Sequence, residues 1–89
     1  MSDRVFRYRP DVRAALRDHG VSPKGGTRPE LVHEFVSDLY RFEIRRLRER
    51  LLAKEFPKIE YASRVVALRM RYRVISMRAR DWLEPQSST

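Results

Sequence analysis

The hydrophobic and polar positions near the N-terminus change from an alternating pattern to a helical one. Residues 2–10 alternate between hydrophobic and basic side chains, which is typical of a short extended arm. The apolar positions that follow recur at helical spacing and predict a short helix over residues 10–19. Gly20 is a suitable left-handed ending for this helix, and Val21 is placed to pack back on Leu16.

A second and much longer helix is predicted over residues 28–56, because this stretch contains no glycine and no proline after Pro29. Thr27 is placed to cap the helix, with Glu30 reaching back, and proline is tolerated in the first turn. Its apolar positions are Leu31, Val32, Phe35, Val36, Leu39, Tyr40, Phe42, Ile44, Leu47 and Leu51. This stripe drifts around the helix, so we expect it to meet different neighbours along its length.

A third helix is predicted after the break at Pro57, over residues 58–73 or longer. Apolar residues recur in alternating steps of four and three, as in a heptad seam, at Tyr61, Val65, Leu68, Tyr72, Ile75, Ala79 and Trp82. Residues 69–74 also alternate in the manner of a strand. Two interpretations therefore stay open for residues 74–83: a continued helix, or an extended tail that pairs with the N-terminal arm.

These elements indicate an all-α protein with a short N-terminal helix and a long antiparallel helical hairpin, with the extended arm as an option. The chain has 89 residues, of which 42% are hydrophobic and 36% charged, enough for one small core. We expect a single domain over residues 1–84 and a disordered tail over residues 85–89.

Positive charge is concentrated in the second half of the chain. The net charge is +8, and residues 41–80 hold thirteen basic and four acidic side chains. The stretch from Arg64 to Arg80 contains six arginines and no acid. Either acids from the second helix pair with these arginines, or an external anion binds them; a merely solvated basic face is the simpler alternative.

Arginine offers planar, bidentate donors that suit phosphate, so nucleic acid is the first partner we expect. The residues predicted to contact it are Arg64, Arg69, Arg71, Arg73, Arg78, Arg80, Arg45 and Arg48. Binding of this kind would be largely independent of nucleotide sequence and steeply dependent on salt.

A second hypothesis assigns the protein to another class, a helical dimerisation or adaptor protein whose basic face binds an acidic protein. We expect a homo-oligomer, since a small core gains stability from association. The predicted dimer interface is the heptad seam, through Tyr61, Val65, Leu68, Tyr72, Ile75 and Trp82.

Residues 12–32 carry a motif in which a leucine precedes a Gly-apolar helix exit, a Pro/Gly loop and a Gly-Thr-basic turn. Its parts are Leu16, Gly20, Val21, Gly26, Thr27, Arg28, Pro29, Glu30 and Leu31. This arrangement resembles the SAP family and its LEM-type relatives, helix–loop–helix modules of which SAP members mostly bind DNA and LEM members bind a DNA-bridging protein. The loop here is one residue longer and the second helix runs further. The resemblance implies phosphate contacts by Lys24 and Arg28, which the acid Glu34 nearby would weaken.

Several kinds of chemistry have no motif in this sequence. The chain contains no cysteine, so thiol chemistry and disulfides are excluded. His19 and His33 lack metal-ligand spacing, and no phosphate-binding glycine loop or nucleophile motif is present. We therefore expect no enzyme activity, no cofactor and no metal. No signal peptide or long apolar run occurs, so we expect a cytoplasmic protein without integral membrane contact.

Overall fold

The computed structural model describes residues 5–85 as an elongated, mostly helical chain measuring 56 × 24 × 17 Å. Its elements, in chain order, are the helix α1 (Pro10–Arg17), the helix α2 (Pro29–Leu52), the 3₁₀ turn η1 (Lys58–Glu60), the helix α3 (Tyr61–Arg71), and the 3₁₀ turns η2 (Arg73–Ser76) and η3 (Ala79–Trp82). The described residues contain no strand, only one isolated β-bridge. The predicted all-α class is confirmed.

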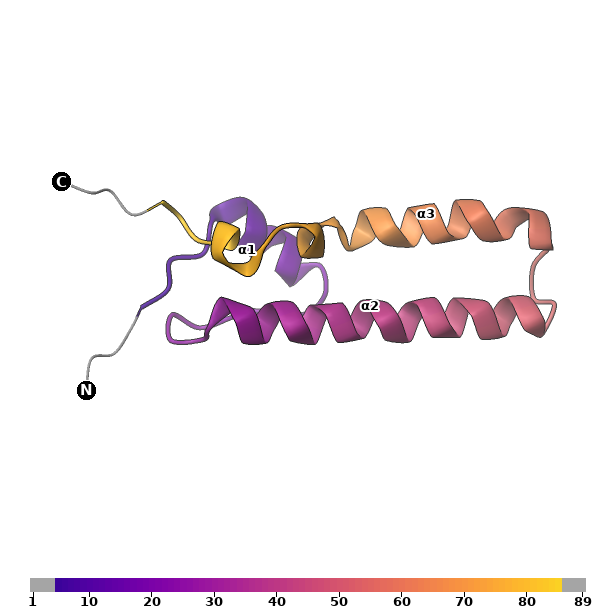
Figure 1. Ribbon diagram of the computed structural model, residues 1–89, viewed down its shortest axis with the longest axis horizontal. Helices are drawn as coiled ribbons and strands as arrows, with labels where there is room; N and C mark the ends of the chain where they lie inside the picture. The colour runs from indigo at the N-terminus through magenta and orange to yellow at the C-terminus, as the bar shows by residue number, and fades with distance from the viewer. Residues whose placement is uncertain (1–4, 86–89) are drawn as a thin grey trace.

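The long helix α2 and the shorter α3 lie side by side along the length of the molecule, while α1 and the C-terminal turns gather at one end (Figure 1). His33, early in α2, contacts the carbonyl of Met77, and Glu43, near its middle, contacts Tyr72. Residues 72–77 therefore lie against α2. The radius of gyration of the molecule is 16.4 Å, well above the ~12 Å expected for a compact chain of this length.

The hydrophobic core is confined to the end of the molecule where α1 packs. Its buried members are Tyr8, Val12, Leu16, Val32, Val36, Leu68, Tyr72, Val74 and Trp82. Towards the far end, where α2 connects to α3, the buried hydrophobic side chains are Leu47 and Phe56. The far end of the helix pair is consequently held by far fewer apolar contacts than the near end.

The predicted end of α1 is confirmed and the predicted cap of α2 is wrong. Gly20 has a φ of 74°, and the N–H of Val21 donates to the carbonyl of Leu16 at 3.0 Å, as in a Schellman ending. Thr27 does not cap α2: its hydroxyl instead accepts the backbone N–H of Lys24 at 3.2 Å. Loop geometry, which the local motif does not specify, turns the hydroxyl away from the helix.

The helix α2 ends at Leu52, earlier than predicted, because the chain turns left-handed directly afterwards. Lys54 has a φ of 60°, the only positive φ outside glycine among the described residues. The N–H of Glu55 donates to the carbonyl of Arg50 at 3.0 Å, and that of Lys54 to Leu51 at 2.9 Å. These two bonds form a second Schellman ending, with lysine in the position that glycine usually takes.

The helix α3 ends at Arg71 and is not continued along the predicted seam. Side chains from other parts of the fold donate to the backbone carbonyls that follow. The pairs are His19 Nε2 to Arg71 O at 2.7 Å, Trp82 Nε1 to Val74 O at 2.9 Å, and His33 Nε2 to Ile75 O and Met77 O at 3.0 and 2.9 Å. Because these carbonyls have partners outside the helix, two 3₁₀ turns replace a continued α-helix.

The end of the chain pairs with the N-terminal arm at one point. Tyr8 and Leu83 form an antiparallel bridge, and the N–H of Arg9 donates to the carbonyl of Trp82 at 2.8 Å. The segment from residue 74 to 83 is thus neither a continued helix nor a full strand. Of the predicted disordered tail, residues 86–89 lie outside the described residues.

Candidate functional site

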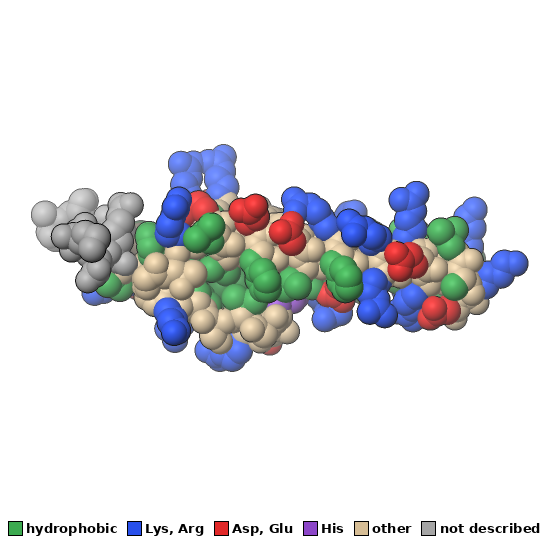
Figure 2. All heavy atoms as spheres, turned by 90° about the horizontal axis from the view of Figure 1, so that it is seen from below, with side chains coloured by type: hydrophobic (Ala, Val, Ile, Leu, Met, Phe, Trp, Pro, Cys, Tyr) green, Lys and Arg blue, Asp and Glu red, His purple; other side chains and the backbone are tan. Residues whose placement is uncertain are grey.

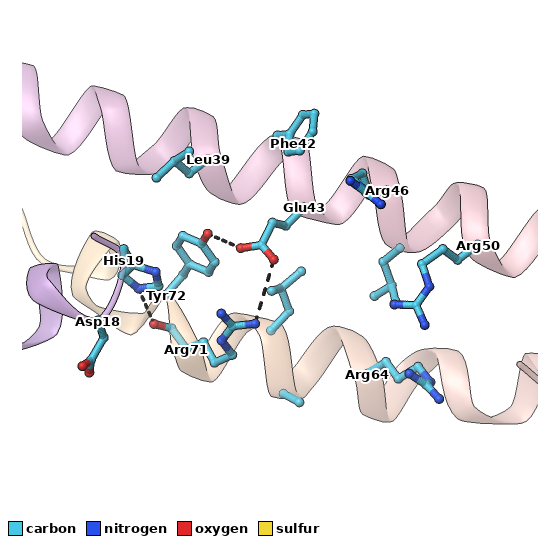
Figure 3. A pocket seen from close by; sticks show the side chains of 13 residues that line it. Asp18, His19, Leu39, Phe42, Glu43, Arg46, Arg50, Arg64, Arg71 and Tyr72 are labelled. Carbon is cyan, nitrogen blue, oxygen red and sulfur yellow. Dashed lines mark hydrogen bonds and ion pairs between the residues drawn. The ribbon is translucent and has the colours of Figure 1, made fainter. Parts of the chain in front are cut away.

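A groove of about 740 Å³ runs between α2 and α3 (Figure 3). Four arginines line it: Arg46 and Arg50 from α2, and Arg64 and Arg71 from α3. The inner end is closed by His19, which follows α1. Each pair of arginines sits at a spacing of four or seven residues, so each pair occupies one face of its helix.

Most of the positive charge in this groove is matched by carboxylates of the same chain. The ion pairs are Arg50 with Glu55 at 3.1 Å, Arg64 with Glu60 at 3.1 Å, and Arg71 with Glu43 at 3.9 Å. All six side chains are at least one-third exposed, so each pair contributes no more than about 1 kcal/mol to stability. The pairs nevertheless leave the groove with little excess charge for an external anion.

Two of the groove arginines also have a structural role at the far end of the helix pair. The buried ring of Phe56 lies beneath the guanidinium groups of Arg64 and Arg50, whose centres are 4.2 and 5.6 Å from the ring centroid. The Nε atom of Arg64 is buried without a hydrogen-bond partner, consistent with its position over the ring. Cation–π contacts of this kind hold the connection between α2 and α3 in place.

Polar contacts around Tyr72 close the inner end of the groove. The Tyr72 hydroxyl donates to the carboxylate of Glu43, and its ring stacks on that of His19 with centroids 4.1 Å apart (Figure 3). Burial, followed by the hydrogen bond to Glu43, raises the pKa of Tyr72 to about 12. The phenol therefore stays protonated and donates over the physiological range, linking α1, α2 and α3 through one side chain.

A different set of arginines lies on the other side of the helix pair. Leu47 and Leu68 are buried where α2 and α3 meet, and the residue before each of them lines the groove. Around each helix, the residue before the leucine lies about 100° to the groove side, and the residue after it lies about 100° to the opposite side. Arg48 and Arg69 therefore lie on the side opposite to the groove, and Arg73 is exposed in the turn η2, just after α3.

We call Arg48, Arg69 and Arg73 the arginine face. All three are exposed, and none forms an ion pair with a carboxylate in the described part of the chain. Basic side chains accordingly border α2 on both edges of its C-terminal half (Figure 2). On the edge away from the groove, Arg48 has no ion pair among the described residues, whereas Arg41, one heptad earlier, is paired with Asp38 at 2.6 Å.

The remaining arginines predicted to bind nucleic acid fall into two groups. Arg45, Arg78 and Arg80 are exposed and likewise have no ion pair within residues 5–85, but Arg45 lies further around α2, away from α3. Arg64 and Arg71 lie on the groove side and are paired. The structure thus does not bring the eight predicted residues together on one surface.

The residues predicted as a dimer interface pack largely inside the chain. Leu68, Tyr72 and Trp82 are buried in the core, and Tyr61, Val65 and Ile75 are half-buried. The heptad spacing reflects packing against α2 and α1, and the seam is not free for a second copy. Trp82, at the end of the predicted seam, is fully buried.

Near the SAP-like motif, Lys24 and Arg28 are both exposed at the surface. Arg28 lies 3.8 Å from the carboxylate of Glu30, so its charge is partly matched. Of these two residues, Lys24 has no ion-pair partner within residues 5–85.

Sequence reasoning missed the groove and the carbonyl contacts of the two histidines. The groove arginines had a visible signal, since Arg64 and Arg71 are one heptad apart and Arg46 and Arg50 one turn apart. The histidines had none, because their partners are more than forty residues away in sequence.

Comparisons with protein-family models, with curated proteins and with solved structures found no match. No group of three or more His, Cys, Asp or Glu residues that could hold a metal ion occurs in residues 5–85. Within the described part of the chain, every helix is too short or too polar to span a bilayer.

Proposed function

We propose that this protein binds nucleic acid through arginine–phosphate contacts, made chiefly by the arginine face. The observation that carries the proposal is that Arg48 and Arg69 are exposed on one side of the helix pair, with Arg73 exposed just beyond α3, and that none of the three has a carboxylate partner in residues 5–85. Guanidinium groups that lack an internal partner repel one another, and a polyanion relieves that repulsion.

The antiparallel hairpin of α2 and α3 is part of this proposal. In antiparallel helices that meet face to face, the residues that follow the contact residue lie on the same side of both helices. The hairpin therefore combines Arg48 of α2 with Arg69 of α3 in one surface. Arg78 and Arg80, exposed near the other end of the molecule, would add contacts with a longer strand.

In this proposal the groove arginines stabilise the fold and do not contact the nucleic acid. Arg64 is engaged by Glu60 and Phe56, and Arg71 by Glu43. A phosphate that entered the groove would have to displace these carboxylates. The net charge of +8 attracts nucleic acid at long range, and the arginine face supplies the close contacts.

Fluorescence anisotropy with a labelled duplex tests the proposal. Each neutralised phosphate contributes about −0.9 to the slope of log affinity against log salt, so three contacts give roughly −2.7. We expect affinity to fall by about 40-fold between roughly 50 and 200 mM salt. Absence of binding at the lower salt concentration would overturn the proposal.

A matched pair of variants locates the contacts. Arg48→Gln/Arg69→Gln removes two charges from the arginine face and should reduce the slope by about two. Arg13→Gln/Arg17→Gln removes two exposed arginines of α1 that also have no ion pair in the described residues, and should leave the slope nearly unchanged. Equal losses in the two variants would contradict the assignment to the arginine face.

An acidic protein is the alternative partner, and the same assay separates it from nucleic acid. Polyglutamate carries a similar line of charge but lacks the bidentate geometry of phosphate. We expect the duplex to bind more tightly than polyglutamate of equal charge at equal salt. Tighter binding of polyglutamate would favour the acidic-protein hypothesis and overturn the proposal.

A further inference from the structure

The outer side of α2 carries an apolar strip that the fold leaves uncovered. Leu31, Phe35 and Phe42 are 56%, 53% and 53% exposed, although the sequence predicted them as part of the core-facing stripe. They are separated by four and seven residues, so they lie within about 40° of one another around the helix. Val32 and Val36, next to Leu31 and Phe35 in sequence, are buried instead.

The side chains beside this apolar strip are negatively charged in the N-terminal half of α2 and positively charged further along. Glu30, Glu34 and Asp38 occupy the N-terminal half of α2, and Arg41 and Arg45 follow in the C-terminal half. Figure 2 shows hydrophobic side chains along this face, with acidic groups beside one half of one edge and basic groups beside the other half. Two copies of such a surface bring opposite charges together only when their α2 helices run in opposite directions.

We propose that the apolar strip is the interface of a homodimer in which two α2 helices pair antiparallel about a two-fold axis. Aligning the helices with the axis between Asp38 and Leu39 places Phe35 of one copy against the partner's Phe42, and repeats the contact by symmetry. The same alignment puts Glu34 within one turn of the partner's Arg45. Parallel pairing would set acid against acid and base against base.

The size of this interface suits a dimer of moderate affinity. A helix of 24 residues is about 36 Å long, and a pair of such helices buries on the order of 1,000 Å² in total. That area lies at the small end of specific interfaces, so we expect dissociation in the micromolar range.

The proposed dimer would place equivalent surfaces of the two copies on the same side of the assembly. The two-fold axis runs perpendicular to the paired helices and through their interface. Each flank of α2 in one copy therefore lies on the same side as the equivalent flank in its partner. Both copies would therefore present Arg48 and Arg69 on one common side. The dimer does not depend on the proposed nucleic-acid binding, because the apolar strip and the arginine face share no residue.

Sedimentation equilibrium of the full chain, from low micromolar to several hundred micromolar, tests the dimer. We expect a reversible monomer–dimer equilibrium for the natural sequence and a monomer throughout for Phe42→Glu. Val66→Glu is the matched control, since Val66 is 55% exposed on α3 and lies outside the strip, and it should dimerise as the natural chain does. A natural chain that stays monomeric, or a Phe42→Glu chain that still dimerises, would overturn the proposal.

A charge exchange tests the antiparallel arrangement and remains informative if Phe42→Glu does not fold. Glu34→Arg would face the partner's Arg45 and should weaken the dimer by about tenfold or more. The double variant Glu34→Arg/Arg45→Glu restores opposite charges between the copies and should recover most of that loss. Since residues 34 and 45 are about 16 Å apart along the same helix, they cannot compensate within one chain. Failure of the double variant to recover would contradict antiparallel pairing.

Discussion

Replacing Trp82 with phenylalanine tests whether the C-terminal turns belong to the core. Trp82 is fully buried, and its Nε1–H donates to the carbonyl of Val74 at 2.9 Å. The substitution removes this hydrogen bond and leaves the carbonyl with the N–H of Met77, at 3.3 Å, as its donor, which costs about 1 kcal/mol. The smaller ring removes roughly 40 Å³ of packed volume, which costs about 1 kcal/mol more. We therefore expect Trp82→Phe to lower the free energy of unfolding by about 2 kcal/mol.

Thermal and urea unfolding followed by far-UV circular dichroism measures this loss. A domain of this size loses about 4–8 °C in Tm for each kcal/mol, so the melting temperature should fall by about 8–16 °C. Val66→Ala serves as a control in which an exposed side chain on α3 is shortened, and the change should be below about 1 kcal/mol. A Trp82→Phe chain as stable as the control would refute the placement of Trp82 at the centre of the core.

Three further predictions concern other parts of the fold. Lys54→Gly should raise the free energy of unfolding by about 0.5–1 kcal/mol in a urea titration, because φ is 60° there; a less stable variant would contradict the left-handed turn. Amide hydrogen exchange should be faster near the helix connection, residues 47–66, than in α1, since fewer apolar contacts hold that end; equal protection would contradict this. Burial raises the pKa values of Tyr8 and Tyr72 from 10.0 to about 12. Their neutral forms are thus favoured in the folded state, and this stability is present below pH 10 and lost as pH rises towards 12; unfolding at high pH that is unchanged in Tyr72→Phe would argue against it.

Local features of the sequence predicted the helical class and several helix ends. Gly20 ends α1 through backbone geometry that glycine alone adopts readily, and Pro29 stands in the first turn of α2. These signals act over a few residues, so a single sequence carries them. Lys54 shows the limit, because nothing in its own side chain signals the left-handed conformation that it adopts.

The end of α3 could not be predicted because the residues that determine it are distant in sequence. The heptad spacing continues to Trp82, yet the carbonyls after Arg71 are taken by His19, His33 and Trp82 itself. Periodicity reports which residues share a helical face and does not report competing donors. The same limit applies to the dimer seam, which periodicity identified as apolar without showing that α1 and α2 cover it.

The sequence indicated a run of arginines without nearby acids, but not how these arginines are arranged in space. A run of arginines without local acids is visible in the sequence, and the three residues of the arginine face belong to the predicted set. Arg64 and Arg71 have carboxylate partners because they lie on the groove side of α3. The sequence alone does not show which side of each helix faces the groove. Arg71 meets Glu43 across the helix pair, whereas Arg69, two residues earlier, points about 200° away from it.

The proposed nucleic-acid binding places a polyanion on the side of the helix pair that lies opposite to the groove. Titration of an isotope-labelled sample with a short duplex, followed by backbone amide and arginine Nε–H NMR signals, tests this placement. We expect the largest shifts at Arg48, Arg69 and Arg73, with little change at Arg46 and Arg64. Shifts centred on those two groove arginines, or no shifts at low salt, would contradict it.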